Sequence, residues 1–244
     1  MLSPLMRNQS PSAADAEEAP NLYGLRRFEN LEADVKRALL EAGRARTFAA
    51  GQVLFERGTV HTHTFIILQG LVRIYHTAHS GREVTLCYWA NGDLAGGPDF
   101  FGGAIHVWSG EALRPTRTVA IPGEDLKALA IRMPRVALWI AHVAMFKLKW
   151  VSLLFQLHGT ESVSQRLPHL LVMLSDVYGV EEAGTVVIRH RLSQSDLSTL
   201  LGTSRQWTNK AMGELRRREL LRIDDGRIVI LDLPGLAERA RGFN

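Results

Sequence analysis

Between Phe48 and Pro122 the chain alternates short apolar runs with glycines at regular intervals. Runs rich in β-branched and aromatic residues have the length of strands; they lie at Thr64–Leu68, Leu71–Tyr75 and Glu83–Trp89. His79–Arg82 has the composition of a hairpin tip, because Gly81 accepts the positive φ that such turns require. Short strands separated by glycine turns are typical of an antiparallel roll or barrel. We therefore expect a β-roll here.

A long stretch without internal glycine or proline follows, from Pro134 to about His158. Its apolar residues predict one helix, which Gly159 would end as a C-cap. One stripe consists of Val136, Ile140, Val143, Trp150, Leu154 and Leu157. Further apolar residues lie elsewhere around the helix, which must then be covered on more than one side. We expect the stripe to pair with the same helix of a second subunit, as in a coiled coil. A central helix in a monomeric core is the alternative.

The remaining periodic segments complete the expected organisation. Helical spacing runs from Leu25 to Leu40, Ser162 is a candidate N-cap for a helix over Val163–Val177, and Val186–Arg191 has the composition of a strand. We expect four parts, which are a disordered tail (1–22), a sensor domain (23–132), a dimerisation helix (133–159) and a DNA-binding domain (160–244). The fold class is then α+β.

Two short helices joined by a glycine are predicted between Ser193 and Arg218. Ser193 and Asp196 have the spacing of a capping box, and Gly202 suits the tight turn. Thr203 or Ser204 would cap the second helix. The polar face that this segment offers to DNA consists of Thr203, Ser204, Arg205, Gln206, Asn209 and Lys210. These side chains can hydrogen-bond to base edges or phosphates.

The sequence after this second helix predicts a β-hairpin. Leu220–Ile223 and Arg227–Ile230 are strand-like and flank an Asp-Gly turn. Helix, turn, polar helix and hairpin in this order are typical of a winged helix-turn-helix. One alternative is that the arginine-rich helix face is simply exposed to solvent. Another is that the segment is an interaction module that does not bind DNA. Both leave the polar face and the wing together unexplained.

Charge and cysteine usage narrow the picture. The formal net charge is only +4, but residues 203–222 hold six cations against two anions, which suits a polyanionic partner. Cys87 is the only cysteine, so the chain can form neither an internal disulfide nor a cysteine-only metal or iron–sulfur site. No metal site is expected. A reducing cytoplasm is the simplest setting. No uninterrupted apolar run approaches the roughly 20 residues of a membrane span, so no membrane partner is expected.

An enzyme with an appended DNA-binding domain is the rival class. The sequence holds no glycine-rich phosphate loop that opens a helix, no His-Glu-x-x-His motif and no nucleophile elbow. Gly92–Gly97 is glycine-rich, but it lies between predicted strands. We expect no enzymatic activity and assign no catalytic residue.

From about Phe28 to Leu231 the sequence resembles the Crp/Fnr family of transcription regulators. The resemblance rests on residues 51–55 with Gly58, the strand 70–74, Gly92-Asp93-Leu94 with Gly96, and the DNA motif at 201–206. It implies a cyclic-nucleotide-binding-like roll, a long dimerisation helix, and a homodimer that binds double-stranded DNA at a palindromic operator. It further implies a small-molecule effector and an interaction with RNA polymerase. Arg205 corresponds to the family arginine that contacts guanine.

The sensor departs from the family pattern where cyclic-AMP receptors bind their ligand. Those receptors use a Gly-Glu-Leu-Gly stretch for the ribose and an Arg-Ser pair for the cyclic phosphate. Here the first stretch reads Gly96-Gly97-Pro98-Asp99, and the second falls near His106-Val107-Trp108, without arginine. A buried phosphate needs charge compensation, so we expect an effector other than cyclic AMP. The cysteines of the oxygen-sensing branch are also absent.

Two kinds of ligand remain open, besides a sensor that binds none. An apolar pocket between roll and helix would suit an aromatic or carboxylated metabolite, with Lys147 as counter-ion. The candidate pocket residues are Phe100, Val107, Trp108, Lys147, Trp150, Val151 and Ser152. Haem, and with it gas sensing, is the second kind. The candidate axial ligands are His61, His63, His76, His106 and His142.

Overall fold

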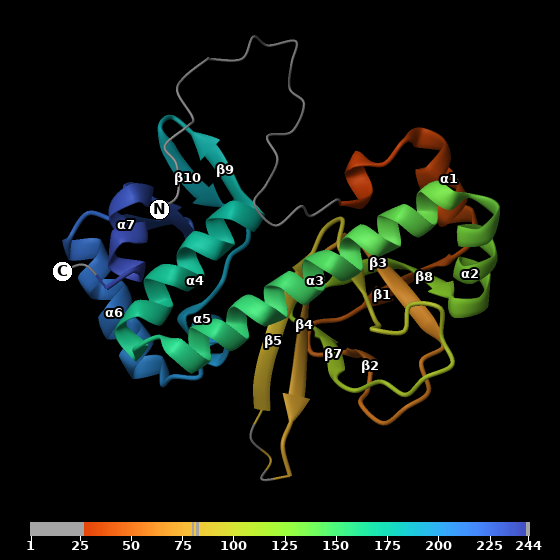
Figure 1. Cartoon of the computed structure of the whole chain (residues 1–244), viewed down its shortest axis with the longest axis horizontal. Coiled ribbons are helices and arrows are strands. Elements are labelled where there is room, and N and C mark those ends of the chain that lie inside the picture. Colours follow the sequence, from red (N-terminus) through yellow and green to blue (C-terminus); the bar gives the residue numbers. More distant parts are fainter. Residues whose placement is uncertain (1–26, 80, 82, 243–244) are drawn as a thin grey trace.

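The computed structural model describes residues 27–79, 81 and 83–242 of the chain. Figure 1 shows a β-roll and a largely helical C-terminal part, with one long helix running along both. The tail expected over 1–22 lies outside the described residues, as do parts of the hairpin tip at 79–82. The α+β class and the antiparallel roll expected from the sequence are confirmed.

Two four-stranded sheets form the roll, with strand orders β1-β8-β3-β6 and β2-β7-β4-β5. Their strands are β1 (Arg44–Phe48), β2 (Val53–Phe55), β3 (His63–Gln69), β4 (Leu71–Thr77), β5 (Glu83–Ala90), β6 (Leu94–Ala95), β7 (Ser109–Ala112) and β8 (Thr116–Pro122). All pairings are antiparallel, and β4 and β5 pair from Leu71↔Ala90 to Thr77↔Glu83. The three strands expected from sequence are therefore each present, and slightly longer.

Short helices close one end of the roll. A 3-10 turn (Phe28–Asn30) precedes α1 (Ala33–Glu41), and α2 (Gly123–Arg132) follows β8. Leu39, Leu126 and Trp139 are buried together with residues of β3 and β8 in a cluster at this end. Arg135, in the first turn of α3, forms ion pairs with Glu32 and Asp34. The start of the long helix is thus held firmly against the roll.

The long helix α3 spans Pro134–Thr160. It continues through Gly159 and ends at Glu161, whose backbone is extended, so the expected glycine cap is wrong. The side chain of Arg166 donates to the main-chain oxygens of His158 and Glu161, which satisfies carbonyls at this end without a left-handed glycine. By length and composition α3 is also apolar enough to cross a membrane, although only a third of its most apolar window is buried. A core or interface helix of a soluble protein passes the same test.

The C-terminal part contains four helices and a small sheet. Its elements are α4 (Val163–Tyr178), β9 (Gly179–Glu182), β10 (Thr185–Ile188), α5 (Gln194–Leu201), α6 (Arg205–Arg217), β11 (Leu221–Asp224), β12 (Arg227–Ile230) and α7 (Leu233–Ala240). The sheet has the order β11-β12-β10-β9. Ser162 and Gln165 form a capping box at the start of α4, as the sequence predicts for Ser162.

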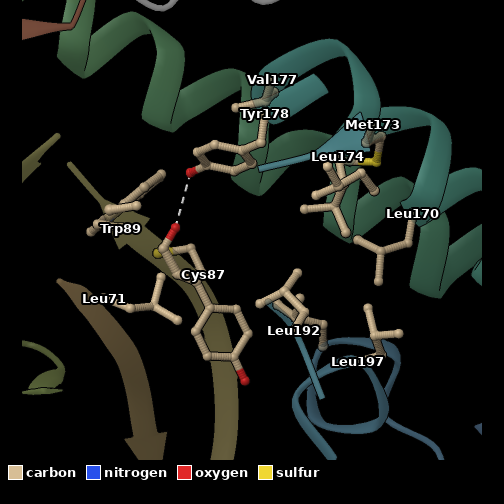
Figure 2. Close-up of a cluster of buried hydrophobic side chains, with 14 of the residues drawn as sticks. Leu71, Cys87, Trp89, Leu170, Met173, Leu174, Val177, Tyr178, Leu192 and Leu197 are labelled. Atoms are coloured by element: carbon tan, nitrogen blue, oxygen red, sulfur yellow. Dashed lines mark hydrogen bonds between the residues drawn. The ribbon is translucent and has the colours of Figure 1, made fainter. Parts of the chain in front are cut away.

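One hydrophobic cluster continues from the roll into the C-terminal part. Figure 2 shows Leu71, Cys87 and Trp89 of the roll facing Leu174 and Tyr178 of α4. Leu192 and Leu197 extend the cluster to α5. Apolar area removed from water stabilises the two parts against each other at about 25 cal/mol per Å². The roll and the C-terminal part therefore share a core.

Candidate nucleic-acid interface and effector region

The first helix of the candidate DNA-binding motif is fixed at both ends. The hydroxyl of Ser193 accepts from the Asp196 amide at 3.1 Å, and the Asp196 carboxylate accepts from the Ser193 amide at 2.8 Å. At the other end Gly202 has φ +63°, which a residue with a Cβ rarely adopts. This turn sets the direction in which α6 leaves α5. The capping box and the glycine turn expected from the sequence are both present.

Helix α6 is anchored by its apolar side. Ser204 is the N-cap, and its hydroxyl accepts from the Trp207 amide at 3.1 Å. Thr208, Met212 and Leu215 are buried, as expected. The hydroxyls of Thr203 and Thr208 lie 3.0 Å apart and bond to each other. Thr203 and Ser204 therefore hold the helix in place, in addition to any contact they make with DNA.

The opposite side of α6 presents four polar side chains to solvent. Arg205, Gln206, Asn209 and Lys210 are all exposed, and no protein partner is described for any of their side chains. They occupy the first two turns of the helix, which is the end that helix-turn-helix proteins direct at base edges. An arginine fork, two amides and an ammonium in this arrangement can bind base edges and phosphates.

The hairpin after α6 has the geometry of a wing. Strands β11 and β12 pair from Leu221↔Ile230 to Asp224↔Arg227, and Asp225 and Gly226 both have positive φ in the connecting turn. Arg191 forms an ion pair with Asp225 at the tip. Arg222 and Arg227 of the hairpin are exposed, as cations that contact DNA phosphates must be.

The assignment of the apolar stripe of α3 to a subunit interface is wrong. Val136, Ile140, Val143, Trp150, Leu154 and Leu157 are at most 8% exposed in the single chain. They pack against the roll and the C-terminal part of their own chain and are not available to a partner. Another row on α3 is free, with the alternating spacing of three and four residues that a coiled-coil seam requires. This row consists of Leu138, Ala141, Met145, Leu148, Ser152 and Phe155, and all six are exposed.

Lys147 is the cation that α3 sends into the roll. Its ammonium donates to the main-chain oxygen of Leu94 and lies 5.0 Å from the ring centre of Trp89 and 4.8 Å from that of Phe100. Burial lowers the pKa of Lys147 to about 8. A partly buried ammonium between two aromatic faces is a site for an anion only if the ligand displaces one of these contacts.

Residues 96–99 and 106–108, which the resemblance aligns with the ligand-binding segments of cyclic-AMP receptors, are connected by His61. The Gly97 amide donates to Nε2 of His61 at 3.1 Å, and a Cβ at Gly97 would meet the Phe100 ring at 3.1 Å. His106 stacks on Phe55 and lies 4.5 Å from His61, ring centre to ring centre. Burial, with His61 nearby, lowers the pKa of His106 to about 4. The imidazole is therefore neutral at pH 7 and offers no charge to a phosphate.

The other candidate effector residues do not gather at one place. Val151 and Ser152 are exposed on α3, and Val107 is exposed on the roll. Trp150 is buried and donates to the main-chain oxygen of Leu86 on β5, 3.1 Å away. Trp108 is half-buried against the core of the roll. In the part of the chain that the structure describes, the only two of these seven residues seen to interact are Phe100 and Lys147. The seven residues therefore do not form the single pocket expected from the sequence, and only Phe100 and Lys147 lie together.

A buried polar group at the border of roll and C-terminal part escaped the sequence analysis. The Asp93 carboxylate accepts from the Ala90 amide at 2.7 Å and lies 3.4 Å from the Tyr178 hydroxyl and 3.9 Å from Nε of Arg27. Burial raises the pKa of Asp93 to about 6, against the opposing effect of Arg27. The Gly-Asp-Leu run marks the position, but its partners come from distant parts of the chain.

Comparison with protein families assigns both parts of the chain. Residues 45–132 match the cyclic nucleotide-binding domain, and residues 165–239 match the Crp-like helix-turn-helix domain. The chain belongs to the Crp/Fnr family of transcription regulators. The resemblance seen in the sequence is thereby confirmed, and this family consists of DNA-binding regulators, not enzymes.

Relatives of this Crp/Fnr regulator cover nearly its whole length. It is 26% identical over 215 residues to the CRP-like cAMP-activated global transcriptional regulator of Mycobacterium tuberculosis. This match spans 88% of this chain and 96% of the relative. It is 26% identical over 199 residues to the cyclic AMP receptor protein of Thermus thermophilus, covering 81% and 88%. A CooA mutant from Carboxydothermus hydrogenoformans shares the fold with a TM-score of 0.73 at 19% identity, covering 91% and 96%.

Proposed function

We propose that this Crp/Fnr regulator acts as a homodimer on a palindromic DNA operator in the cytoplasm, where it controls transcription by RNA polymerase. The exposed polar face of α6 carries this proposal. Arg205, Gln206, Asn209 and Lys210 project from a helix whose opposite face is locked by caps and packing. Arg205 is the residue we assign to guanine, since an arginine fork pairs with O6 and N7 of that base.

The free row on α3 supports the dimer. Leu148 and Phe155 are 68% and 79% exposed, although both are large and apolar. Two parallel copies of α3 would bury these rows against each other, with Ala141 and Ser152 allowing close approach. A two-fold dimer places two recognition helices one turn of DNA apart, about 34 Å, which matches a palindromic site.

The effector that we propose is not cyclic AMP. The M. tuberculosis relative is described as cAMP-activated, but this chain has Gly97 where such receptors place the ribose carboxylate. His106 stands near the phosphate position and is neutral at pH 7. Loss of one partner of a buried charged contact typically costs several kcal/mol. That loss converts a micromolar ligand to a millimolar one.

The positive charge that an effector would meet at the roll is instead the ammonium of Lys147. We propose an aromatic or carboxylated metabolite that lies against Phe100 and takes the Lys147 ammonium as its counter-ion. Haem is not part of this proposal; the rings of His61 and His106 are in contact, so these two cannot serve as opposite axial ligands of one haem.

Selection from a random DNA pool tests the proposed function. The purified protein should enrich one palindromic motif, and Arg205→Ala should lose about 1–3 kcal/mol of specific binding while weak non-specific binding remains. Arg216→Ala is the matched control, since Arg216 is exposed near the far end of α6. Enrichment of no motif would refute sequence-specific binding. Equal discrimination by Arg205→Ala would refute the assignment of Arg205.

A further inference from the structure

A cleft of about 470 Å³ lies between the sensor and the DNA-binding domain, and Lys147 is not among its lining residues. Its sensor wall comes from the turns after β3, β5 and β7, together with the segment before the first 3-10 turn. Its other wall is Arg189 and His190, which directly follow β10. The cleft has the volume of an ordinary small-molecule site. Any ligand in it would touch both domains.

The lining of this cleft is strongly cationic. Arg27, Arg114 and Arg189 line it, and Glu29 is the only acidic residue among its lining residues. The remaining lining residues Asn30, Gln69, Gly70, Asn91 and Pro115 are uncharged. Arg27 faces the Asp93 carboxylate, but Arg114 and Arg189 form no ion pair in the part of the chain that the structure describes, and like charges that line one cleft repel one another. An anion between them would relieve this repulsion, and each fork can bind two oxygens of a phosphate or carboxylate.

His190 lines the same cleft and lies within electrostatic reach of all three cations. Burial lowers its pKa to about 4, and Arg27, Arg114 and Arg189 all push it in the same direction. Nε2 of His190 is buried without a hydrogen-bond partner, whereas Nε of Arg27 faces the Asp93 carboxylate at 3.9 Å. Buried polar atoms are nearly always paired, so this unpaired ring nitrogen calls for a partner. A neutral imidazole with its hydrogen on Nε2 can donate to an anion.

Part of this cation cluster is already held in position. Arg27 donates to the Val177 main-chain oxygen at 2.9 Å and lies over the Tyr178 ring. Arg114 donates to the Arg191 main-chain oxygen at 3.4 Å. These contacts fix the two side chains across the domain border before a ligand arrives. Preorganised groups bind more tightly, because less side-chain freedom is lost on binding.

We propose that this cleft, lined by Arg27, Arg114, Arg189 and His190, is a second effector site that binds a small polyanion with phosphate or clustered carboxylate groups. A free anion suits it better than the DNA backbone, because the cationic groups line one cleft from both domains. A ligand that touches both walls favours the domain arrangement in which the walls face each other, and so changes DNA affinity by its differential binding. This regulatory consequence rests on the proposed function, whereas the binding does not.

Titration calorimetry and thermal melting with inorganic pyrophosphate test the site, with citrate as a carboxylate probe and sodium chloride at matched ionic strength. We expect saturable binding and a raised melting temperature with pyrophosphate. Arg114→Gln with Arg189→Gln should weaken the binding at least tenfold, because two charged hydrogen-bond donors are lost. Arg189 is exposed, so Arg189→Gln alone provides a second variant that leaves the packing intact.

Two control variants separate the cleft from other anion sites. Arg117→Gln removes an exposed arginine of β8 outside the lining and should bind pyrophosphate like the wild type. Arg205→Gln with Lys210→Gln removes cations of α6 and should also leave it unchanged. Unaltered binding in the cleft variant, or no binding to the wild type at millimolar concentration, would overturn the proposal. If the cleft variant lost DNA affinity with a smaller salt slope but still bound pyrophosphate, the cations would serve the DNA backbone instead.

Failure of the proposed function gives a different result. A protein that selects no operator can still bind pyrophosphate at Arg114 and Arg189, because calorimetry requires no DNA. Conversely, a protein that binds its operator but does not bind pyrophosphate would remove the cleft proposal and leave the regulator intact.

Discussion

The hydroxyl of Tyr178, in the last turn of α4, donates to the main-chain oxygen of Tyr88 in β5 across 3.0 Å (Figure 2). Burial raises the pKa of Tyr178 well above its ordinary range, so the phenol keeps its proton and remains a donor. Tyr88 in turn points its own hydroxyl at α5, 3.1 Å from the Thr199 hydroxyl. Two tyrosines thus connect the sensor sheet to the helices that hold the recognition helix.

Tyr178→Phe should weaken this connection without opening a cavity. The variant leaves the buried Tyr88 carbonyl without this donor, at a cost of about 1–3 kcal/mol in unfolding free energy. Denaturant titration measures the loss. Tyr75→Phe on β4, whose ring lies under Arg73 and away from α4, serves as the matched control and should lose less. Equal stability of Tyr178→Phe and the wild type would mean that solvent replaces the bond.

Leu148→Glu should separate the subunits while each chain stays folded. Leu148 is 68% exposed in the single chain, so the charge harms only a paired surface. Sedimentation should show a monomer at micromolar concentration, and binding to a palindromic site should weaken. Val143→Glu is the contrasting variant, because Val143 is buried in its own chain. The buried charge should lower the free energy of unfolding by several kcal/mol. A dimeric Leu148→Glu protein would place the interface elsewhere.

Gln206→Glu should change the preferred half-site. A glutamine both donates and accepts, which suits adenine, whereas a glutamate only accepts and favours the amino group of cytosine. Selection from the same random pool should shift one position of the motif toward a C·G pair. An unchanged motif would indicate that Gln206 faces a phosphate.

Cyclic AMP should bind weakly or not at all. Neither Gly97 nor the neutral His106 supplies the charges that its ribose and phosphate require. The positions of Arg114, in the interdomain cleft, and of Arg117, exposed on β8, give the roll no substitute. Titration calorimetry measures this directly. A low-micromolar dissociation constant coupled to tighter DNA binding would overturn this assignment of the sensor.

Acid should destabilise the protein through its buried histidines. His106 has a folded-state pKa of about 4, below the ordinary 6.5, so the unfolded chain binds more protons between these values. The contribution of the neutral imidazole to the free energy of unfolding is fully present above pH 6.5. It is lost as the pH falls toward 4, at no more than about 1.4 kcal/mol per pH unit. Asp93, raised to about 6, acts in the opposite sense over part of this range. His106→Phe should flatten the measured slope, and a slope identical to wild type would contradict the burial argument.

Local signals were the parts that the sequence predicted well. The Ser193–Asp196 capping box, the left-handed Gly202 and the Asp225-Gly226 wing turn each depend on residues within a few positions of one another. Their chemistry is decided before the rest of the chain folds, so reading the sequence is enough. The exposed row of α6 follows from the same periodicity, because its buried and polar faces differ sharply in composition.

Non-local relationships could not be read in this way. Apolar residues surround α3, so the sequence could not say which face its own chain covers; the buried Val143 and the exposed Leu148 look alike in a pattern. The interdomain cleft joins Arg27, Arg114 and Arg189, which are separated by dozens of residues. Only the packing of the roll against α4 brings them together.

The hydrophobic cluster that runs unbroken from β4 and β5 through α4 to α5 has a consequence for how the protein can be taken apart. A DNA-binding fragment cut after α3 would expose Leu174, Tyr178 and Leu192 to water, and the remaining sensor would expose Leu71 and Tyr88. Neither fragment is a ready-made module. Transplanting the recognition segment onto another sensor therefore requires carrying its half of this contact surface along.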